Sequence, residues 1–286
     1  MEPRSLAIHD GSFHADEVSA CALLLLFDKI DRERIYRTRD PNLLKLCEYV
    51  CDVGGVYDPK SKRFDHHQPE YQGTMSSAGM VLLFLKETKE ISPHLYEHFN
   101  QTLILGVDAH DNGLMKLEMG TTSFSLVISN FLPIQHSASK QELDQAFLEA
   151  VEFALGHLDR LQKRYFYALE CREMVQKAME KGEYALVFDQ AIPWLESFFD
   201  LGGELHPAQF VVMPTGDHWK LRCIPPSLDQ RMKVRKALPE SWAGLRDQGL
   251  SQVSQVPGAI FCHKGRFISI WQTKEDAIKA LHKVLE

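Results

Sequence analysis

Residues 6–17 of the chain are Leu6-Ala7-Ile8-His9-Asp10-Gly11-Ser12-Phe13-His14-Ala15-Asp16-Glu17. The first three are apolar and predict a short buried strand, and the apolar spacing over 16–29 predicts a helix. Residues 34–39 and 49–53 predict two further strands. A strand–helix–strand order favours a parallel sheet with crossover helices. We therefore predict an α/β fold whose N-terminal domain has a parallel sheet with helices on both faces.

The remaining chain predicts a connector and a second domain. Helices are expected at 77–88 and 95–105, with Gly106 marking the end of the second. Residues 141–181 keep apolar side chains at helical spacing and predict one long helix or two. Short strand candidates follow from residue 183 onward. The predicted organisation is a catalytic domain at 1–140, a helical connector at 141–182 and a smaller α/β domain at 183–286.

The composition is typical of a soluble globular protein that buries a core, with 44% hydrophobic and 25% charged residues. No apolar run approaches the roughly 18 residues of a membrane helix, and no signal or transit peptide is visible. The six cysteines are scattered without a CxxC pair, which favours reduced thiols. We therefore expect a cytoplasmic protein that does not enter a membrane. The formal charge of −7 argues against a general nucleic-acid coat protein.

Two short segments combine histidine with aspartate. His9, His14 and Asp16 follow the first predicted strand, and Asp65-His66-His67 lies further along the chain. A lone histidine is more often structural than a ligand, but two such segments together favour a metal site. Imidazoles and carboxylates without thiolate suit Mn²⁺ or another octahedral cation better than a structural zinc.

Asp52 and Asp108 each close an apolar run, which we interpret as a strand end with the loop after it, or as a helix end. Strand ends in an open α/β sheet meet at one edge, so all four segments could form one cleft. Helix capping or a turn would explain either aspartate alone, whereas a carboxylate shared between two cations accounts for both. For Asp111 and Asn112 we favour a turn-forming role over support of the ligands. The pattern predicts a metal-dependent hydrolase.

Ser76 and Ser77 stand at the start of the helix predicted at 77–88. Free backbone N–H groups and hydroxyls at a helix start are well placed to hold a phosphate. Ordinary N-capping by Ser76 explains the same residues nearly as well.

The ordered series of motifs resembles the DHH phosphoesterase superfamily, and more closely its melanocyte proliferating gene family of metal-dependent exonucleases. The resemblance covers nearly the whole chain. The N-terminal motifs that carry it are His9-Asp10-Gly11-Ser12-Phe13-His14-Ala15-Asp16-Glu17, Arg37-Thr38-Arg39-Asp40-Pro41, Asp52-Val53-Gly54-Gly55, Asp65-His66-His67-Gln68, Ser76-Ser77-Ala78-Gly79 and Val107-Asp108-Ala109-His110-Asp111-Asn112-Gly113. The C-terminal motifs are Arg235-Lys236-Ala237-Leu238-Pro239-Glu240-Ser241-Trp242 and Phe261-Cys262-His263.

The resemblance implies two adjacent divalent ions, with Mn²⁺ as the first choice and Mg²⁺ or Co²⁺ as alternatives. The implied metal ligands are His9, His14, Asp16, Asp52, His66 and Asp108. Asp52 would bridge the ions and His67 would face the substrate phosphate, which makes Asp52 and His67 the catalytic candidates. His110 would add a ligand or do nothing.

The resemblance also implies that the smaller C-terminal domain closes over the nucleotide. The candidates for phosphate contacts in that domain are Arg222, Arg235, Arg246 and His263. For each arginine taken singly, a solvated surface charge is an equal alternative.

The leading interpretation is a 3′–5′ exonuclease that hydrolyses RNA or short oligonucleotides with two metal ions, with a homodimer as a candidate assembly. A manganese-dependent pyrophosphatase or small-dinucleotide phosphodiesterase is the second interpretation, because stacking platforms for single strands are not obvious in the sequence. A non-catalytic scaffold is the third. The intact ligand candidates argue against it, since a scaffold gains nothing from clustered buried charge.

Overall fold

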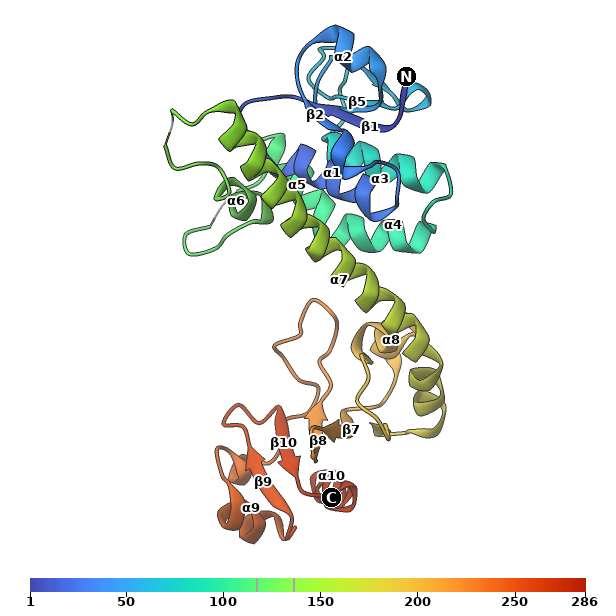
Figure 1. Ribbon diagram of the computed structural model, residues 1–286. Helices are drawn as coiled ribbons and strands as arrows, with labels where there is room; N and C mark the ends of the chain where they lie inside the picture. The colour runs from blue at the N-terminus through green and yellow to red at the C-terminus, as the bar shows by residue number, and fades with distance from the viewer. Residues whose placement is uncertain (117, 136) are drawn as a thin grey trace. The chain divides into compact units, whose positions relative to one another are not determined.

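The structure is a computed structural model that describes residues 1–116, 118–135 and 137–286. The chain divides into two compact units, Met1–Tyr165 and Phe166–Glu286. Residues Lys140–Lys181 form a single helix, α7, and the division falls inside it (Figure 1). The sequence allowed one helix or two over this segment, and the structure shows one.

The first unit contains a five-stranded, mostly parallel sheet. β1 pairs in parallel with both β2 and β3, and β3 pairs in parallel with β5. Only the edge strand β4 runs antiparallel to its neighbour. The predicted parallel sheet is confirmed. In sheet order the strands are β2 (Ile35–Arg37), β1 (Glu2–Ile8), β3 (Cys47–Cys51), β5 (Arg63–Phe64) and β4 (Tyr57–Asp58).

Helices pack on both faces of this sheet, as predicted. Successive side chains of a strand point to opposite faces. Leu6 and Ile8 of β1 therefore join the large core beneath α1 (Ala15–Leu26) and α3 (Ser77–Glu87). Ala7, between them, joins a small apolar cluster on the other face with α2 (Pro41–Leu46).

The segment after α3 differs from the prediction. α4 (Pro93–Phe99), a π-helical stretch (Asn100–Ile104) and α5 (Leu105–Asp111) follow one another without a break. Gly106 therefore lies inside a helix, and the prediction that the helix ends there was wrong. Asp108 lies in α5, within one turn of its end, so of its two interpretations the strand end was wrong and the helix end agrees with the structure. The buried side chains of Leu103, Ile104 and Val107 hold this segment against the core. Such packing outweighs the roughly 1 kcal/mol cost of a helical glycine. A short helix, α6 (Phe124–Ser129), completes the unit before α7.

The second unit contains a five-stranded mixed sheet. β6 and β7 are parallel, and the other neighbours are antiparallel. Short strands do follow residue 183, as predicted, so a smaller C-terminal α/β unit is confirmed. In sheet order they are β6 (Ala185–Val187), β7 (Phe210–Thr215), β8 (His218–Cys223), β10 (Ile268–Trp271) and β9 (Ala259–Cys262). The helices are α8 (Leu195–Asp200), α9 (Asp247–Ser254) and α10 (Lys274–Leu285).

All six cysteines are buried and free, in line with the predicted reduced thiols. Within the described ranges, no helix combines the length and apolarity needed to cross a bilayer. The cytoplasmic location and the homodimer stay predictions.

Candidate metal centre

The loop between β1 and α1 carries the first candidate ligands and is held by packing. Phe13 is fully buried and meets Phe147 of α7 edge to face, with ring centroids 5.6 Å apart. Burying such a ring contributes about 2–3 kcal/mol. His14 then forms the N-cap of α1, and the Glu17 carboxylate accepts a hydrogen bond from the His14 backbone N–H at 2.9 Å. These contacts determine where His9 and His14 lie relative to Glu17.

Asp52 lies directly after β3 in a left-handed backbone conformation, with φ +55°. Residues with short polar side chains tolerate this conformation better than most others. Gly54 and Gly55 follow with φ +98° and +68°, so the chain turns sharply here. The turn brings the Asp52 carboxylate to the end of β1, where its Oδ2 lies 3.3 Å from His9 Nε2.

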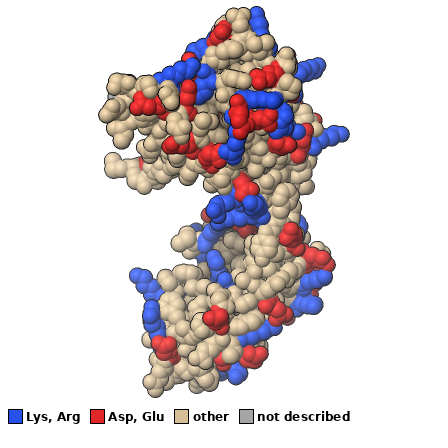
Figure 2. Space-filling view, viewed as in Figure 1, with Lys and Arg blue, Asp and Glu red and all other residues tan. Residues whose placement is uncertain are grey.

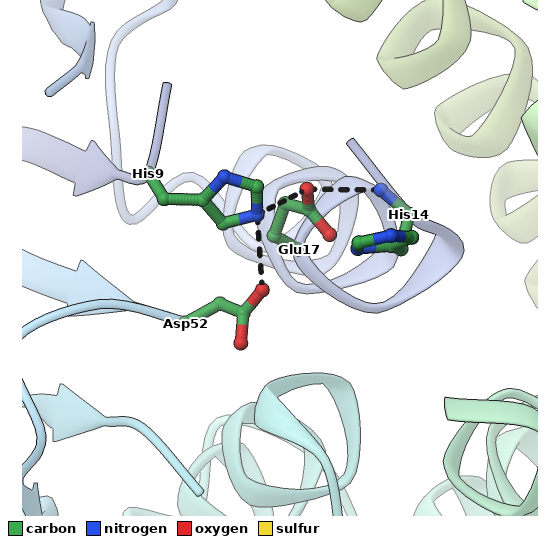
Figure 3. A group of neighbouring side chains, drawn as sticks. All are labelled: His9, His14, Glu17 and Asp52. Atoms are coloured by element: carbon green, nitrogen blue, oxygen red, sulfur yellow. Dashed lines mark hydrogen bonds and ion pairs between the residues drawn. The ribbon is translucent and has the colours of Figure 1, made fainter. Parts of the chain in front are cut away.

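Four side chains meet at this point: His9, His14, Glu17 and Asp52 (Figure 3). One ligand atom from each lies within 4.8 Å of the others, a spacing that fits a single metal ion. His9 Nε2 is 2.9 Å from Glu17 Oε1. The other ring nitrogen, Nδ1, lies 3.0 Å from the Asp10 carbonyl oxygen, which accepts a hydrogen bond when Nδ1 is protonated. That contact directs Nε2 into the group, as is usual for metal-binding histidines.

Two further groups continue from the first. One consists of Asp52, His66 and His67, and the other of Asp16, His66 and Asp111. His66 Nε2 lies 3.1 Å from Asp111 Oδ2 and 3.4 Å from Asp52 Oδ1. Asp52 therefore belongs to the first and second groups, and His66 belongs to the second and third. Such sharing suits two neighbouring cations with Asp52 between them.

Buried carboxylate oxygens without donors test whether the residues fit a cation. Asp16 Oδ2, Glu17 Oε2 and Asp52 Oδ1 are buried and accept no hydrogen bond from any described residue, although Asp52 Oδ1 lies within ion-pair distance of His66 Nε2 at 3.4 Å. A buried polar atom without a partner costs roughly 1–3 kcal/mol, and more when it is charged. A divalent ion bound to these oxygens would remove that cost. The donor set fits a hard or borderline cation.

The histidines and carboxylates shift one another's pKa values. Burial disfavours the charged form of His9, but ion pairing with Asp52 and Glu17 outweighs burial and raises its pKa to about 10. Burial likewise opposes protonation of His66, and Asp111 and Asp52 raise its pKa to about 10. Burial, with added repulsion from Asp52 and Asp111, raises the pKa of Asp16 well above its usual value. Without metal ions, the protonated imidazoles of His9 and His66 neutralise part of the charge of the neighbouring carboxylates. Bound metal ions would take over that role.

Asp108 lies outside these three groups of described residues, as does His110. Asp108 Oδ1 accepts hydrogen bonds from the Ser76 N–H at 3.0 Å, the Ser76 hydroxyl at 2.7 Å and the Gly79 N–H at 3.2 Å. A Cβ at Gly79 would lie 2.3 Å from Asp108 Oδ2, so only glycine fits there. The first turn of α3 thus binds a carboxylate of the chain itself, and the role of Asp108 as a ligand stays a prediction.

The other donors at the start of α3 are also engaged. The Ala78 N–H donates to Asp16 Oδ1 at 2.6 Å, and the Ser77 hydroxyl donates to the Phe64 carbonyl at 2.7 Å. Ser76 and Ser77 are fully buried. The helix start orients Asp16 and Asp108. The predicted contact of Ser76 and Ser77 with a substrate phosphate stays a prediction.

A cleft of about 790 Å³ opens onto the first group. His67 lines it with a side chain that is 63% exposed, and the His67 Nδ1 is 2.8 Å from Asp65 Oδ1. Asp65 is itself held, because its Oδ2 accepts a hydrogen bond from the Gly55 N–H at 2.6 Å. Asp65 therefore orients His67, and the His67 ring faces the cleft. The cleft is lined by His9, Asp10, Gly11, Ser12, His14, Arg39, Asp52, Val53, Gly54, Gly55, Asp65, His67, Gln68 and Pro69.

Comparison with known proteins shows the family to which this chain belongs. The model of the family MYG1_exonuc, described as "Uncharacterised protein family (UPF0160)", matches residues 5–285. The MYG1 protein of Chlamydia trachomatis serovar D is 50% identical over 284 residues, which cover 99% of this chain and 97% of the relative. The human MYG1 exonuclease is 33% identical over 329 residues, covering 100% of this chain and 86% of the relative. The chain belongs to the MYG1 family. The predicted family assignment is thereby confirmed, and the human relative carries the name exonuclease.

Among solved structures, RecJ of Thermus thermophilus in complex with Mn²⁺ aligns with 98% of this chain and 51% of its own. The TM-score is 0.28 and the sequence identity 12%.

The C-terminal residues predicted to contact phosphate lie in the second unit, and their role stays a prediction. Arg235 donates to the carbonyl oxygens of His206 and Gly203 at 2.7 Å each, so its guanidinium is engaged inside the protein. Arg246 lies over the Phe261 ring, 5.2 Å from its centroid. His263 Nδ1 accepts a hydrogen bond from the Gly265 N–H. Arg222 lies on β8, opposite Val211 and Ile268.

Sequence reasoning missed Glu17 and Asp111 as candidate ligands. Glu17 stands three residues after the N-cap His14, the usual position of a capping carboxylate, and this spacing could have revealed it. Asp111 stands three residues after Asp108, on the same side of a helix. The strand or loop assigned to that segment hid the relation.

Arg37 connects the loop between β1 and α1 to α7, and we expect its replacement to weaken metal binding. Its buried guanidinium donates to the Gly11 carbonyl at 2.5 Å, pairs with Asp144 at 2.9 Å, and lies 4.9 Å from the Phe147 ring centroid. Lysine lacks the planar fork needed for these contacts. Arg37→Lys should lower Mn²⁺ affinity roughly tenfold, the effect of losing a partner that orients ligands. Competition with a chromophoric chelator measures this. The partly exposed Arg34→Lys is the matched control. Equal Mn²⁺ affinities in the two variants would contradict the role of Arg37.

Metal uptake should release protons. Because the pKa values of His9 and His66 are about 10, both imidazoles are charged at pH 7.5 without metal. A metal ion binds the neutral form, so uptake displaces these protons and apparent affinity rises with pH up to about pH 10. Calorimetric titration with Mn²⁺ in two buffers of different ionisation enthalpy counts the released protons. Identical heats in the two buffers would contradict the release of protons from His9 and His66 on metal uptake.

Proposed function

We propose that this chain is a 3′–5′ exonuclease that hydrolyses phosphodiester bonds in RNA or short oligonucleotides with two Mn²⁺ ions. The observation that supports the proposal best is the series of three ligand groups, which are linked through Asp52 and His66 and of which the first opens onto a cleft. The name of the human relative, MYG1 exonuclease, agrees with the reaction class.

The proposed ligands form two sets. His9, His14, Glu17 and Asp52 would hold one ion. Asp16, His66 and Asp111 would hold the other, with Asp52 shared between them. Two bound cations would lower the pKa of an attacking water and stabilise charge on the phosphoryl oxygens. Asp10 and the α3 N–H groups orient these side chains, which keeps the ligand geometry independent of substrate.

His67 is the proposed protein group that contacts the reacting phosphate. Asp65 accepts from the His67 backbone N–H at 3.1 Å and lies 2.8 Å from its ring Nδ1. The ring is therefore held in one orientation, with Nε2 left for the substrate. A donor at that position would contact a non-bridging oxygen, where negative charge grows during the reaction.

One assay tests the reaction and separates it from the alternatives. Purified protein is supplied with Mn²⁺, Mg²⁺ or Co²⁺ in turn and with end-labelled RNA, DNA, dinucleotides or pyrophosphate. Release of nucleoside monophosphates from the 3′ end of RNA supports the proposal. Phosphate release from pyrophosphate alone would replace the substrate assignment. Less than one bound transition-metal ion per chain, with no turnover of any substrate, would favour the scaffold.

A further inference from the structure

Arg39 stands at a rigid position at the edge of the metal cleft. β2 ends at Arg37, and the Thr38 N–H continues the sheet by donating to the Ile8 carbonyl at 2.7 Å. Asp40 on the other side caps α2 and accepts from the Asn42 N–H at 2.9 Å. The backbone of Arg39 is thus held on both sides. Its side chain lines the cleft and is 65% exposed.

Arg39 is the one lysine or arginine among the described residues that line this cleft. Its Nε lies 3.3 Å from Asp10 Oδ1. Asp10 adjoins His9, and the Asp10 carbonyl oxygen lies 3.0 Å from the His9 ring Nδ1. The guanidinium is therefore tethered to the residue that orients a proposed metal ligand. An ion pair this exposed contributes little to stability, so stability does not explain the arrangement.

One face of the molecule carries charged side chains of both signs. On the face drawn in Figure 2, basic side chains are interspersed with acidic ones. A phosphate approaching such a surface meets repulsion as well as attraction, which limits binding by general electrostatics. A cation placed inside the cleft acts at short range, next to the proposed metal ligands.

We propose that Arg39 forms a phosphate-binding subsite at the mouth of the cleft, which takes a phosphate group of the substrate strand. This inference rests on the proposed function. The contact with Asp10 occupies Nε, and the two terminal nitrogens remain for bidentate hydrogen bonds to phosphate oxygens. Because phosphate carries no base identity, Arg39 positions any nucleotide sequence alike. Arg39 is a substrate-binding residue and not a metal ligand.

Kinetics of three variants test the subsite. Arg39→Ala should raise KM for an oligonucleotide roughly 10- to 100-fold, the range for losing a hydrogen bond to a charged group. The value of kcat and the bound Mn²⁺ per chain should stay near those of the natural protein. Arg39→Lys should recover part of the KM, because it restores the charge without the fork. Arg160→Ala is the matched control, since Arg160 is an exposed arginine of α7 that does not line the cleft.

Salt dependence adds a second readout. Each phosphate contact contributes about 0.7 to the slope of log affinity against log salt for a single strand, so Arg39→Ala should reduce that slope by about this amount. A KM within twofold of the natural protein, with an unchanged slope, would overturn the subsite.

Failure of the exonuclease proposal and failure of the Arg39 subsite give different results. If the natural protein with Mn²⁺ releases no mononucleotide, the exonuclease proposal fails, whatever the variants do. The subsite is then judged by calorimetric titration of inorganic phosphate into Mn²⁺-loaded protein. Weaker binding by Arg39→Ala than by Arg160→Ala supports the subsite, and equal binding refutes it.

Discussion

Asp52→Asn protein is expected to lose hydrolytic activity by roughly 1,000-fold or more, because a shared metal ligand contributes several kcal/mol of transition-state stabilisation. Asp52 belongs to two of the three ligand groups, with its oxygens 3.3 Å from His9 Nε2 and 3.4 Å from His66 Nε2. Asparagine keeps the size of the side chain and tolerates the left-handed φ of +55°, so the turn should survive. Bound Mn²⁺, measured by elemental analysis after desalting, should fall below two ions per chain.

Asp28→Asn is the matched control for Asp52→Asn. Asp28 also has a left-handed φ, of +55°, but its side chain is 88% exposed and pairs with Arg4. The control should keep both the ions and the turnover. An Asp52→Asn protein that binds two ions and hydrolyses substrate at the natural rate would remove the basis for the binuclear centre.

The second large effect is expected at Asp111. Its Oδ2 lies 3.1 Å from His66 Nε2, in a group with Asp16. Asp111→Asn should lower the affinity of the second ion about 100-fold, because an amide carries no charge to balance the cation. Calorimetric titration with Mn²⁺ should then show one tight site in place of two.

Asp108→Ala should affect stability and leave the ions bound. It would leave the two N–H groups and the hydroxyl that donate to Asp108 Oδ1 without an acceptor in a buried place. The expected loss is about 2–3 kcal/mol of unfolding free energy, or several degrees in Tm. Loss of an ion from Asp108→Ala with both ions kept in Asp111→Asn would favour the sequence-based ligand set.

Much of the first unit was predictable because its signals are local. The apolar triplet Leu6-Ala7-Ile8 followed by a polar loop predicted β1, and the helical spacing after it predicted α1. Where a local rule competed with burial in the core, the prediction failed. Gly106 marks a helix end by local rules, but burial of Val107 and its neighbours continues the helix past it.

Arg37 and Arg39 also show that burial is hard to predict from the sequence. They stand two residues apart in one motif, and the sequence gives no reason to separate them. The structure buries Arg37 against Phe147 and leaves Arg39 in the cleft, because the strand ends between them. Burial depends on elements far along the chain, so residue type alone does not predict it.

The sequence by itself determined the family, the two-unit α/β architecture and the chemistry of the candidate ligands, since these depend on residue types and their order. Only the tertiary structure decided which carboxylates join the histidines. The first turn of α3 binds Asp108 through Ser76 and Gly79, while Asp111, one helical turn later, reaches His66. The physical reason is competition: a buried carboxylate is held by whichever donors packing brings within reach, and packing is a property of the whole fold.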